Sequence, residues 1–280
     1  MEYIKLNNGV EMPKLGLGVF QMNDDQVREA VPAALESGYR LIDTASRYYN
    51  EKAVGAALAE AGVPREELFI TTKLWFKDHG YVKTKEAFEV SLDNLRLDRL
   101  DLYLIHQPFG DYYGAWRAME ELLDEGRVCA IGVSNFSTDR YFDLITHNRI
   151  VPAVNQLETH PLNQQIATRE LLHRHGTVLQ AWSPLAQAHP DVFNDPTLAG
   201  IAQAHCKTLA QVILRWLTQR DIPVVVKSTH EKRLRENIDV FDFQLTENDM
   251  QAIAGLNRQQ VLADFTHQDP RMLELLLTLA

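Results

Sequence analysis

The chain has 280 residues, 45% of them hydrophobic and 24% charged, which is enough to bury about three quarters of its unfolded surface in one α/β barrel or two smaller domains. Its 28 basic and 38 acidic side chains give a formal net charge of −10, which argues against a general nucleic-acid binder, although a local basic pocket stays compatible. With two cysteines, no signal-peptide pattern and no apolar run near the ~20 residues of a membrane helix, the sequence predicts a cytoplasmic protein without membrane partners.

Apolar runs alternate with helix-length amphipathic stretches along the whole chain. First comes "YIKLNNGVEMPKL", which predicts a hairpin turning at Asn8-Gly9 that could plug a barrel. Eight runs then predict strands at residues 15–18, 41–43, 69–73, 102–106, 130–133, 153–156, 178–182 and 223–226. The last gap is the longest, and "DPTLAGIAQAHC" predicts an extra helix there before "LAQVILRWLTQR". Eight βα units predict an α/β fold, a (β/α)₈ TIM barrel that forms a single domain over residues 1–280.

A doubly wound two-domain fold is the structural alternative. It would need a glycine fingerprint after the first strand, whereas "LGLGVF" supplies Gly16 and Gly18 without a third glycine opening a helix. No linker or change of composition marks a domain boundary either. The barrel is therefore the better prediction.

Polar residues follow three neighbouring predicted strands. Asp43 and Tyr48 lie in "LIDTASRYYNE", Lys73 in "FITTKLW" and His106 in "DLYLIHQP". Each has an ordinary structural explanation when taken alone: a turn aspartate, a packed tyrosine, a solvated lysine, a structural histidine. Because the carboxyl ends of barrel strands open at one mouth, we expect the four side chains to meet there and form a site. Asn50 is expected to cap the helix that follows.

The chain resembles the aldo-keto reductases over nearly its whole length, through "LGLGVF", "DTASRYYNE", "ITTKLW", "LDLYLIHQP", "IGVSNF", "VNQLETHP", "AWSPLA" and "VVVKSTHEKRLREN". Among their members it is most similar to the small bacterial diketogluconate and aldehyde reductases. The resemblance implies a monomeric barrel that reduces aldehydes or ketones with NADPH, with Asp43, Tyr48, Lys73 and His106 as its catalytic tetrad.

Carbonyl reduction explains why these residue types are needed. A carbonyl that accepts hydride needs a proton on oxygen, and a tyrosine with a pKa of about 10 donates slowly at neutral pH. A charged Lys73 held by Asp43 is expected to lower the pKa of the Tyr48 phenol, while His106 orients the carbonyl.

The same resemblance implies a dinucleotide site on the later strands. Ser134, Asn135 and Gln156 would bind the nicotinamide carboxamide, and Trp182 would stack on its ring, although core packing is an equal alternative for Trp182. The implied contacts to the rest of NADPH are Ser183, Leu185, Lys227, Ser228, Thr229, Arg233, Glu236 and Asn237, of which Lys227, Ser228 and Arg233 meet the 2′-phosphate and Glu236 and Asn237 the adenine.

Phe20, Tyr49, Trp75 and Gln107, with the tail "VLADFTHQDPRMLELLL", are expected to shape a pocket for small polar aldehydes, α-dicarbonyls or keto sugars. Two alternatives stay open: a barrel that binds NADPH as a redox sensor with negligible turnover, and a phosphate-handling barrel isomerase. Asp43, His106 and His160 could in principle ligate a metal, but no ligand spacing occurs and Lys73 would repel the cation, so no metal is predicted.

Overall fold

The computed structural model describes residues 1–262 and 266–278 and contains a closed barrel of parallel strands in the order β10-β3-β4-β5-β6-β7-β8-β9. The strands are β3 (Leu15–Gly18), β4 (Leu41–Asp43), β5 (Phe69–Leu74), β6 (Leu100–Ile105), β7 (Val128–Ser134), β8 (Val154–Glu158), β9 (Val178–Trp182) and β10 (Val224–Val226). The barrel closes where Val224 to Val226 pair with Leu15 to Leu17. The predicted barrel is confirmed, and each predicted strand overlaps an observed one with ends displaced by at most two residues.

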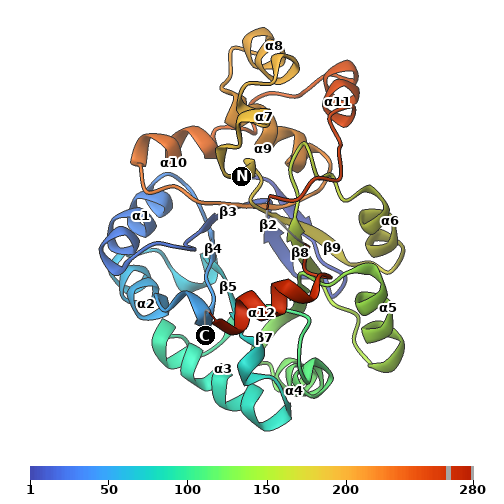
Figure 1. The fold of residues 1–280 in the computed structure, drawn as a ribbon. Coiled ribbons are helices and arrows are strands. Elements are labelled where there is room, and N and C mark those ends of the chain that lie inside the picture. The colour runs from blue at the N-terminus through green and yellow to red at the C-terminus, as the bar shows by residue number, and fades with distance from the viewer. Residues whose placement is uncertain (263–265, 279–280) are drawn as a thin grey trace.

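Helices surround the barrel in the alternating order that the sequence predicts (Figure 1). They are α1 (Asp24–Glu36), α2 (Glu51–Glu60), α3 (Tyr81–Leu95), α4 (Tyr112–Asp124), α5 (Thr138–His147), α6 (Ile166–Arg174), α9 (Leu209–Gln219) and α10 (Glu231–Ile238). The long gap before β10 holds α7 (Pro190–Phe193) and the expected extra helix α8 (Pro196–Ala204), and α11 (Glu247–Ala254) and α12 (Pro270–Thr278) end the chain. None of the helices formed by the described residues has the length and the apolar run needed to cross a bilayer.

Side chains on the strands divide between two cores because successive residues point to opposite faces. Leu41, Phe69 and Leu102 belong to the cluster that fills the barrel, whereas Ile42 and Ile70 belong to the larger cluster between sheet and helices. Both faces are therefore buried, which is why these strands are nearly continuous apolar runs.

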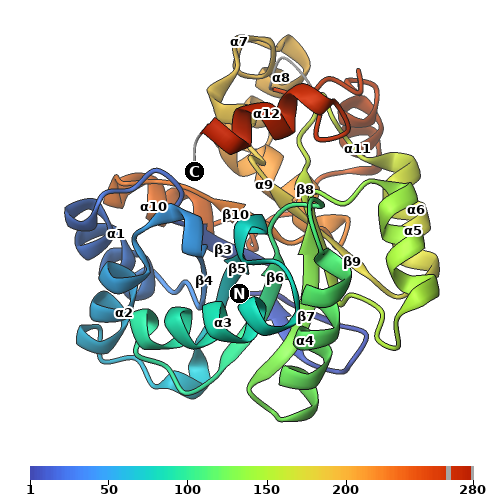
Figure 2. The same cartoon turned by 60° about the horizontal axis from the view of Figure 1, so that its bottom comes forward.

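The two ends of the barrel are closed differently. Hairpin β1 (Tyr3–Lys5) and β2 (Glu11–Pro13) confirms the predicted turn, and Leu6 and Met12 join the interior cluster beside the first residues of the strands. Helix α12, drawn in red, crosses the ring of strands in Figure 1 and lies at the other side of the barrel from the hairpin in Figure 2. The strand ends that carry the polar residues therefore lie beneath the C-terminal helix.

Candidate active site

Strand alternation brings Asp43, Lys73 and His106 to one place. Asp43 is two residues beyond Leu41, and His106 is two residues beyond Leu104, both of which point into the barrel. Lys73 is four residues beyond the inward-facing Phe69, so it also points inward. The polar residues thus form the layer above the apolar filling, at the carboxyl ends of β4, β5 and β6.

The amine of Lys73 is fully buried and has three oxygen partners. Its Nζ lies 2.5 Å from Asp43 Oδ1, 2.9 Å from the carbonyl oxygen of Thr44 and 3.3 Å from the Tyr48 hydroxyl. The other Asp43 oxygen accepts a hydrogen bond from Gln156 Nε2 at 2.9 Å. A charged pair is thereby held in a site almost without solvent, with the phenol as its third member.

Tyr48 is positioned by the 3₁₀ turn η1 (Ser46–Tyr48), which follows β4 directly. Ser46 Oγ donates to the Lys73 carbonyl at 3.0 Å, and Tyr49 takes a left-handed conformation with φ of 57°. This bond ties the turn to β5, so the phenol and the amine that contacts it are fixed to the same strand.

The predicted side-chain cap by Asn50 is wrong, although Asn50 is the residue that precedes α2. Its side chain donates to the carbonyls of Val19 at 2.9 Å and Met22 at 3.1 Å, and it accepts from Thr44 Oγ1 at 3.0 Å. Those carbonyls belong to the preceding βα loop, so Asn50 joins two loops of the mouth instead of capping its own helix.

The pKa values in this site follow from burial first. Burial lowers the pKa of Lys73, but Asp43 and Tyr48 more than offset it, so the pKa of the amine is raised and the amine stays protonated. Burial also raises the pKa of the Tyr48 phenol above its ordinary value, and the charge of Lys73 offsets only part of that rise. The expected net lowering of the pKa of Tyr48 is therefore wrong. Lys73 is already paired with Asp43, and the desolvation of a buried phenolate raises the pKa by more than the attraction of Lys73 lowers it.

His106 follows β6 and lies beside Tyr48, with its ring edge-on to the phenol ring at a centroid distance of 5.6 Å. Burial, followed by the charge of Lys73, lowers the pKa of His106 well below its ordinary value, so the imidazole is neutral near pH 7. Its Nδ1 is buried without a hydrogen-bond partner in the described part of the chain. The imidazole of His106 is therefore neutral, and its Nε2 is the ring nitrogen that can face the mouth of the barrel.

A hydrogen-bond network connects this tetrad to the predicted nicotinamide residues. Gln156 donates both to Asp43 and to Gln180 Oε1, at 2.9 Å each, which leaves its own Oε1 as an acceptor. Asn135 donates to the His106 carbonyl at 3.1 Å and to Ser134 Oγ at 3.2 Å, and its Oδ1 accepts from Trp182 Nε1 at 3.0 Å. The indole of Trp182 is thus fixed at the end of β9.

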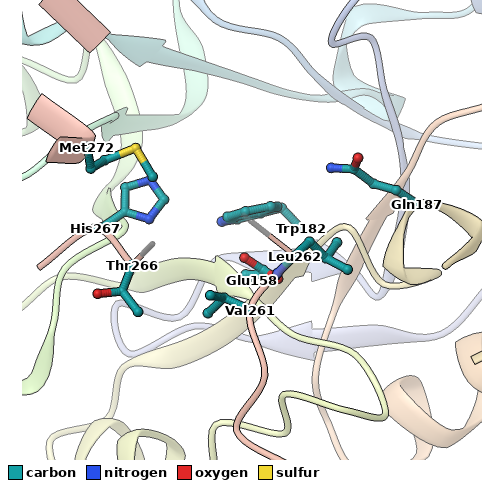
Figure 3. Close-up of a pocket in the computed structure, with 8 residues that line it drawn as sticks. All are labelled: Glu158, Trp182, Gln187, Val261, Leu262, Thr266, His267 and Met272. Atoms are coloured by element: carbon teal, nitrogen blue, oxygen red, sulfur yellow. The ribbon is translucent and has the colours of Figure 1, made fainter. Parts of the chain in front are cut away.

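A cavity of about 300 Å³ lies over Trp182, where the C-terminal tail meets the barrel (Figure 3). The His267 ring stands edge-on to the indole at a centroid distance of 6.3 Å, and Met272 lies beside His267. The tail therefore lines the mouth with Val261, Leu262, Thr266, His267 and Met272, while Ala263, Asp264 and Phe265 of the predicted tail lie outside the described residues. Its influence on substrate choice stays a prediction.

Glu158, at the end of β8, has a part in the site that sequence reasoning missed. Its Oε1 accepts a hydrogen bond from the Leu262 backbone at 2.6 Å and lies 3.0 Å from Nε2 of the fully buried His160. This carboxylate fastens the tail to the barrel. The position of Glu158 at the end of a predicted barrel strand was the sequence feature that could have indicated this role.

Within the described ranges, no three His, Cys, Asp or Glu side chains are grouped as a metal site would require.

The residues predicted for the adenosine end of the dinucleotide gather around β10 and α10. Lys227 and Arg233 are exposed, and neither side chain has an ion pair or hydrogen bond with the residues that the structure describes, whereas Arg235 is paired with Glu231 at 2.7 Å. Ser228 is buried and accepts from the His230 backbone at 3.1 Å. Two unpaired cations beside a helix start suit an anionic group. The other predicted residues are Thr229, next to Ser228 in the chain, Glu236 and Asn237 on α10, and Ser183 and Leu185 after the end of β9.

The predicted substrate residues surround the tetrad unevenly. The Phe20 ring lies 4.9 Å from that of Tyr48, and the Trp75 ring lies 5.2 Å from that of His106, whereas Tyr49 is 73% exposed. Gln107 is buried, and its Oε1 has no hydrogen-bond partner among the described residues. Phe20 therefore packs against the Tyr48 ring, and Trp75 packs against the His106 ring.

Known proteins share this arrangement of barrel and chain. The model of the aldo/keto reductase family matches residues 14–258. Glyoxal reductase of Bacillus subtilis (strain 168) is 48% identical over 259 residues, which cover 92% of this chain and 93% of that protein. The crystal structure of MGS-M4, an aldo-keto reductase from a Medee basin deep-sea metagenome library, has a TM-score of 0.91 and 46% identity and covers 94% of this chain and 97% of that one. The crystal structure of a Bombyx mori aldo-keto reductase in complex with NADP has a TM-score of 0.90 and 36% identity. That match covers 94% of this chain and 95% of the Bombyx mori chain. The resemblance seen in the sequence is thus confirmed, and the chain belongs to the aldo/keto reductase family.

Proposed function

We propose that this protein reduces small aldehydes or ketones to alcohols with NADPH, and that Tyr48 donates the proton. The observation that carries the proposal is the fully buried amine of Lys73, which bonds to Asp43 at 2.5 Å and to the Tyr48 hydroxyl at 3.3 Å. A lysine in this position gives the phenol a cation at the moment when it becomes an anion. A packing tyrosine has no need of such a partner.

The chain's own residues act on the substrate oxygen. Because the pKa of Tyr48 is raised, the phenol is protonated at neutral pH and can give its proton to the far more basic oxygen that forms as hydride reaches the carbonyl carbon. The protonated Lys73 then stabilises the phenolate that remains, and Asp43 holds the amine in place. The neutral His106 donates a hydrogen bond from Nε2 to the same substrate oxygen and sets its angle.

NADPH, when bound, supplies the hydride. The donor set fits it: the free Oε1 of Gln156 can accept from a carboxamide, the half-buried Trp182 offers a ring face, and Lys227 and Arg233 are unpaired cations for the 2′-phosphate. The Bombyx mori relative was solved with NADP, which supports the same cofactor for this chain.

Small polar carbonyls, including α-dicarbonyls, are the proposed substrate class. The relative from Bacillus subtilis that is named a glyoxal reductase supports it, as does the polar wall that Gln107 contributes beside His106. Keto sugars fit the same polarity. The intact tetrad favours turnover over the alternative of an NADPH sensor, which would not need an acid poised beside a buried lysine.

The test is the oxidation of NADPH, followed by absorbance, with a panel of glyoxal, methylglyoxal, simple aromatic aldehydes and keto sugars. Purified protein should consume NADPH with at least one class and release the matching alcohol. Tight binding of NADPH with no turnover across the panel would favour the sensor instead.

A further inference from the structure

Arg47 stands directly before Tyr48 in η1, and nothing in the proposed reduction uses it. Its side chain is half-buried at the mouth, yet it has no hydrogen bond or ion pair with the residues that the structure describes. The guanidinium is therefore available to an anion that enters the mouth.

Two aromatic rings hold the guanidinium in place. Its central carbon lies 4.8 Å from the centre of the Tyr49 ring and 5.7 Å from that of Trp75, within the range of a cation–π contact. Contacts with ring faces consume none of the five N–H donors of an arginine. The side chain is thus held by its flat faces and keeps its donors for another group.

Trp75 connects this cation to the reacting centre. Its indole packs on the guanidinium and also edge-on against His106 at 5.2 Å, and His106 in turn contacts Tyr48. A substrate whose carbonyl lies between Tyr48 and His106 would therefore extend along Trp75 toward Arg47. The charge of Arg47 also reaches His106, because it is the smallest of the contributions to the lowered pKa of that imidazole, after burial, Lys73, His267 and His79.

We infer that Arg47 binds the carboxylate of an anionic substrate, so that the preferred substrates are aldehydes or ketones carrying one carboxylate about one ring's width from the carbonyl. A guanidinium matches a carboxylate with two parallel N–H···O bonds, which gives both charge and orientation. A single cation suits one carboxylate better than a phosphate dianion. The inference rests on the proposed function and adds a substrate class to it.

The experiment compares 4-carboxybenzaldehyde with its methyl ester, which has nearly the same size but no charge. The ester's aldehyde is the more electrophilic, so each variant is compared with wild type on the same substrate. The variants are Arg47→Met, which keeps an unbranched apolar side chain, and Arg47→Lys, which keeps the positive charge but cannot form the two parallel N–H···O bonds of a guanidinium. Lys5→Met, in the hairpin at the closed end of the barrel, makes the same change of net charge away from the mouth. Each protein is assayed for kcat/KM with NADPH.

Arg47→Met should lower kcat/KM for the acid by about tenfold to a hundredfold, the effect of losing charge-assisted hydrogen bonds. The ester should change little, Arg47→Lys should keep part of the preference for the acid, and Lys5→Met should resemble wild type. Equal losses for acid and ester, or no loss for the acid, would overturn the inference while leaving the reductase function standing.

A binding measurement separates this inference from the reductase function. Titration calorimetry of 4-(hydroxymethyl)benzoate, the alcohol product, into protein saturated with NADP⁺ needs no turnover. Wild type should bind it about tenfold or more tightly than Arg47→Met does. Equal affinity in the two proteins would overturn the carboxylate site even if aldehydes are reduced, and unequal affinity would support it even if no aldehyde is.

Discussion

Replacing Lys73 by Met tests whether the buried amine is both a structural and a catalytic partner. The substitution keeps an unbranched side chain of similar length but removes the charge and all three donor contacts, to Asp43, Thr44 and Tyr48. Among the residues that the structure describes, Asp43, which is 3% exposed, would keep only Gln156 as a side-chain donor. The variant therefore leaves a buried carboxylate without its counter-charge.

The expected loss follows from that geometry. Removing one partner of a buried ion pair costs about 3–5 kcal/mol in the free energy of unfolding, because the remaining charge stays desolvated. Adding Asp43→Asn removes the orphaned charge, so the double variant should regain a large part of the stability. It should not regain the rate, because Tyr48 would still lack the cation that stabilises its phenolate.

Urea unfolding followed by tryptophan fluorescence measures the stability, and NADPH oxidation with one good aldehyde measures kcat/KM. Lys77→Met, at an exposed lysine four residues further on, is the matched control and should stay within about 0.5 kcal/mol of wild type. A loss below about 1 kcal/mol for Lys73→Met would refute the picture of a dry ion pair. Recovery of the wild-type rate in the double variant would refute the role of Lys73 in supporting the acid.

Three further predictions concern the cofactor, the pocket wall and a buried histidine. Arg233→Ala should weaken the affinity for NADPH by about tenfold to a hundredfold in fluorescence titration and leave the affinity for NADH nearly unchanged. Arg235 is already paired with Glu231, so the control Arg235→Ala should change both affinities less. Equal losses of affinity for NADPH and NADH in Arg233→Ala would contradict the role of Arg233. Gln107→Trp should narrow the substrate range because an indole is bulkier than the buried amide it replaces. Across aldehydes of increasing size, kcat/KM should therefore fall most for the large ones. Unchanged relative kcat/KM values would mean that Gln107 does not line the pocket. Burial lowers the pKa of His79 from 6.5 to about 4, so between these values the unfolded chain binds a proton that the folded chain does not, and the free energy of unfolding decreases as the pH is lowered from 6.5 to 4. His79→Gln should remove up to about 3 kcal/mol of that pH dependence, whereas parallel curves of stability against pH for the variant and wild type would contradict the assignment.

Local pattern was sufficient to predict the barrel and the meeting of the tetrad. Asp43, Lys73 and His106 each stand an even number of residues beyond an inward-facing apolar side chain, and that period is readable in the sequence. Asn50 was assigned a cap because cap preference is local, whereas the carbonyls of Val19 and Met22 come from a loop about 30 residues earlier. No local pattern reports that distance.

Burial was the second quantity that the sequence did not supply. The direction of the pKa shift of Tyr48 depends on how much desolvation exceeds the attraction of Lys73, which is a property of the packed site. Arg47 did not stand out in the sequence for the same reason, because its contacts with the Tyr49 and Trp75 rings become visible only when the surrounding side chains are in place. The tail residue His267 has no periodic pattern that would bring it to Trp182.

The central claim is that Tyr48 is the acid and that its neighbour Tyr49, with the same side chain, is not. The direct measurement is single-turnover reduction of a simple aromatic aldehyde by protein saturated with NADPH, for wild type, Tyr48→Phe and Tyr49→Phe. Tyr48→Phe should lose a factor of about 10² to 10⁴ in rate while its NADPH affinity hardly changes, because general-acid help is realised only in the transition state. Tyr49→Phe should keep the rate, since its 73% exposed phenol has no contact with Lys73. A Tyr48→Phe protein that reduces the aldehyde as fast as wild type would contradict the account.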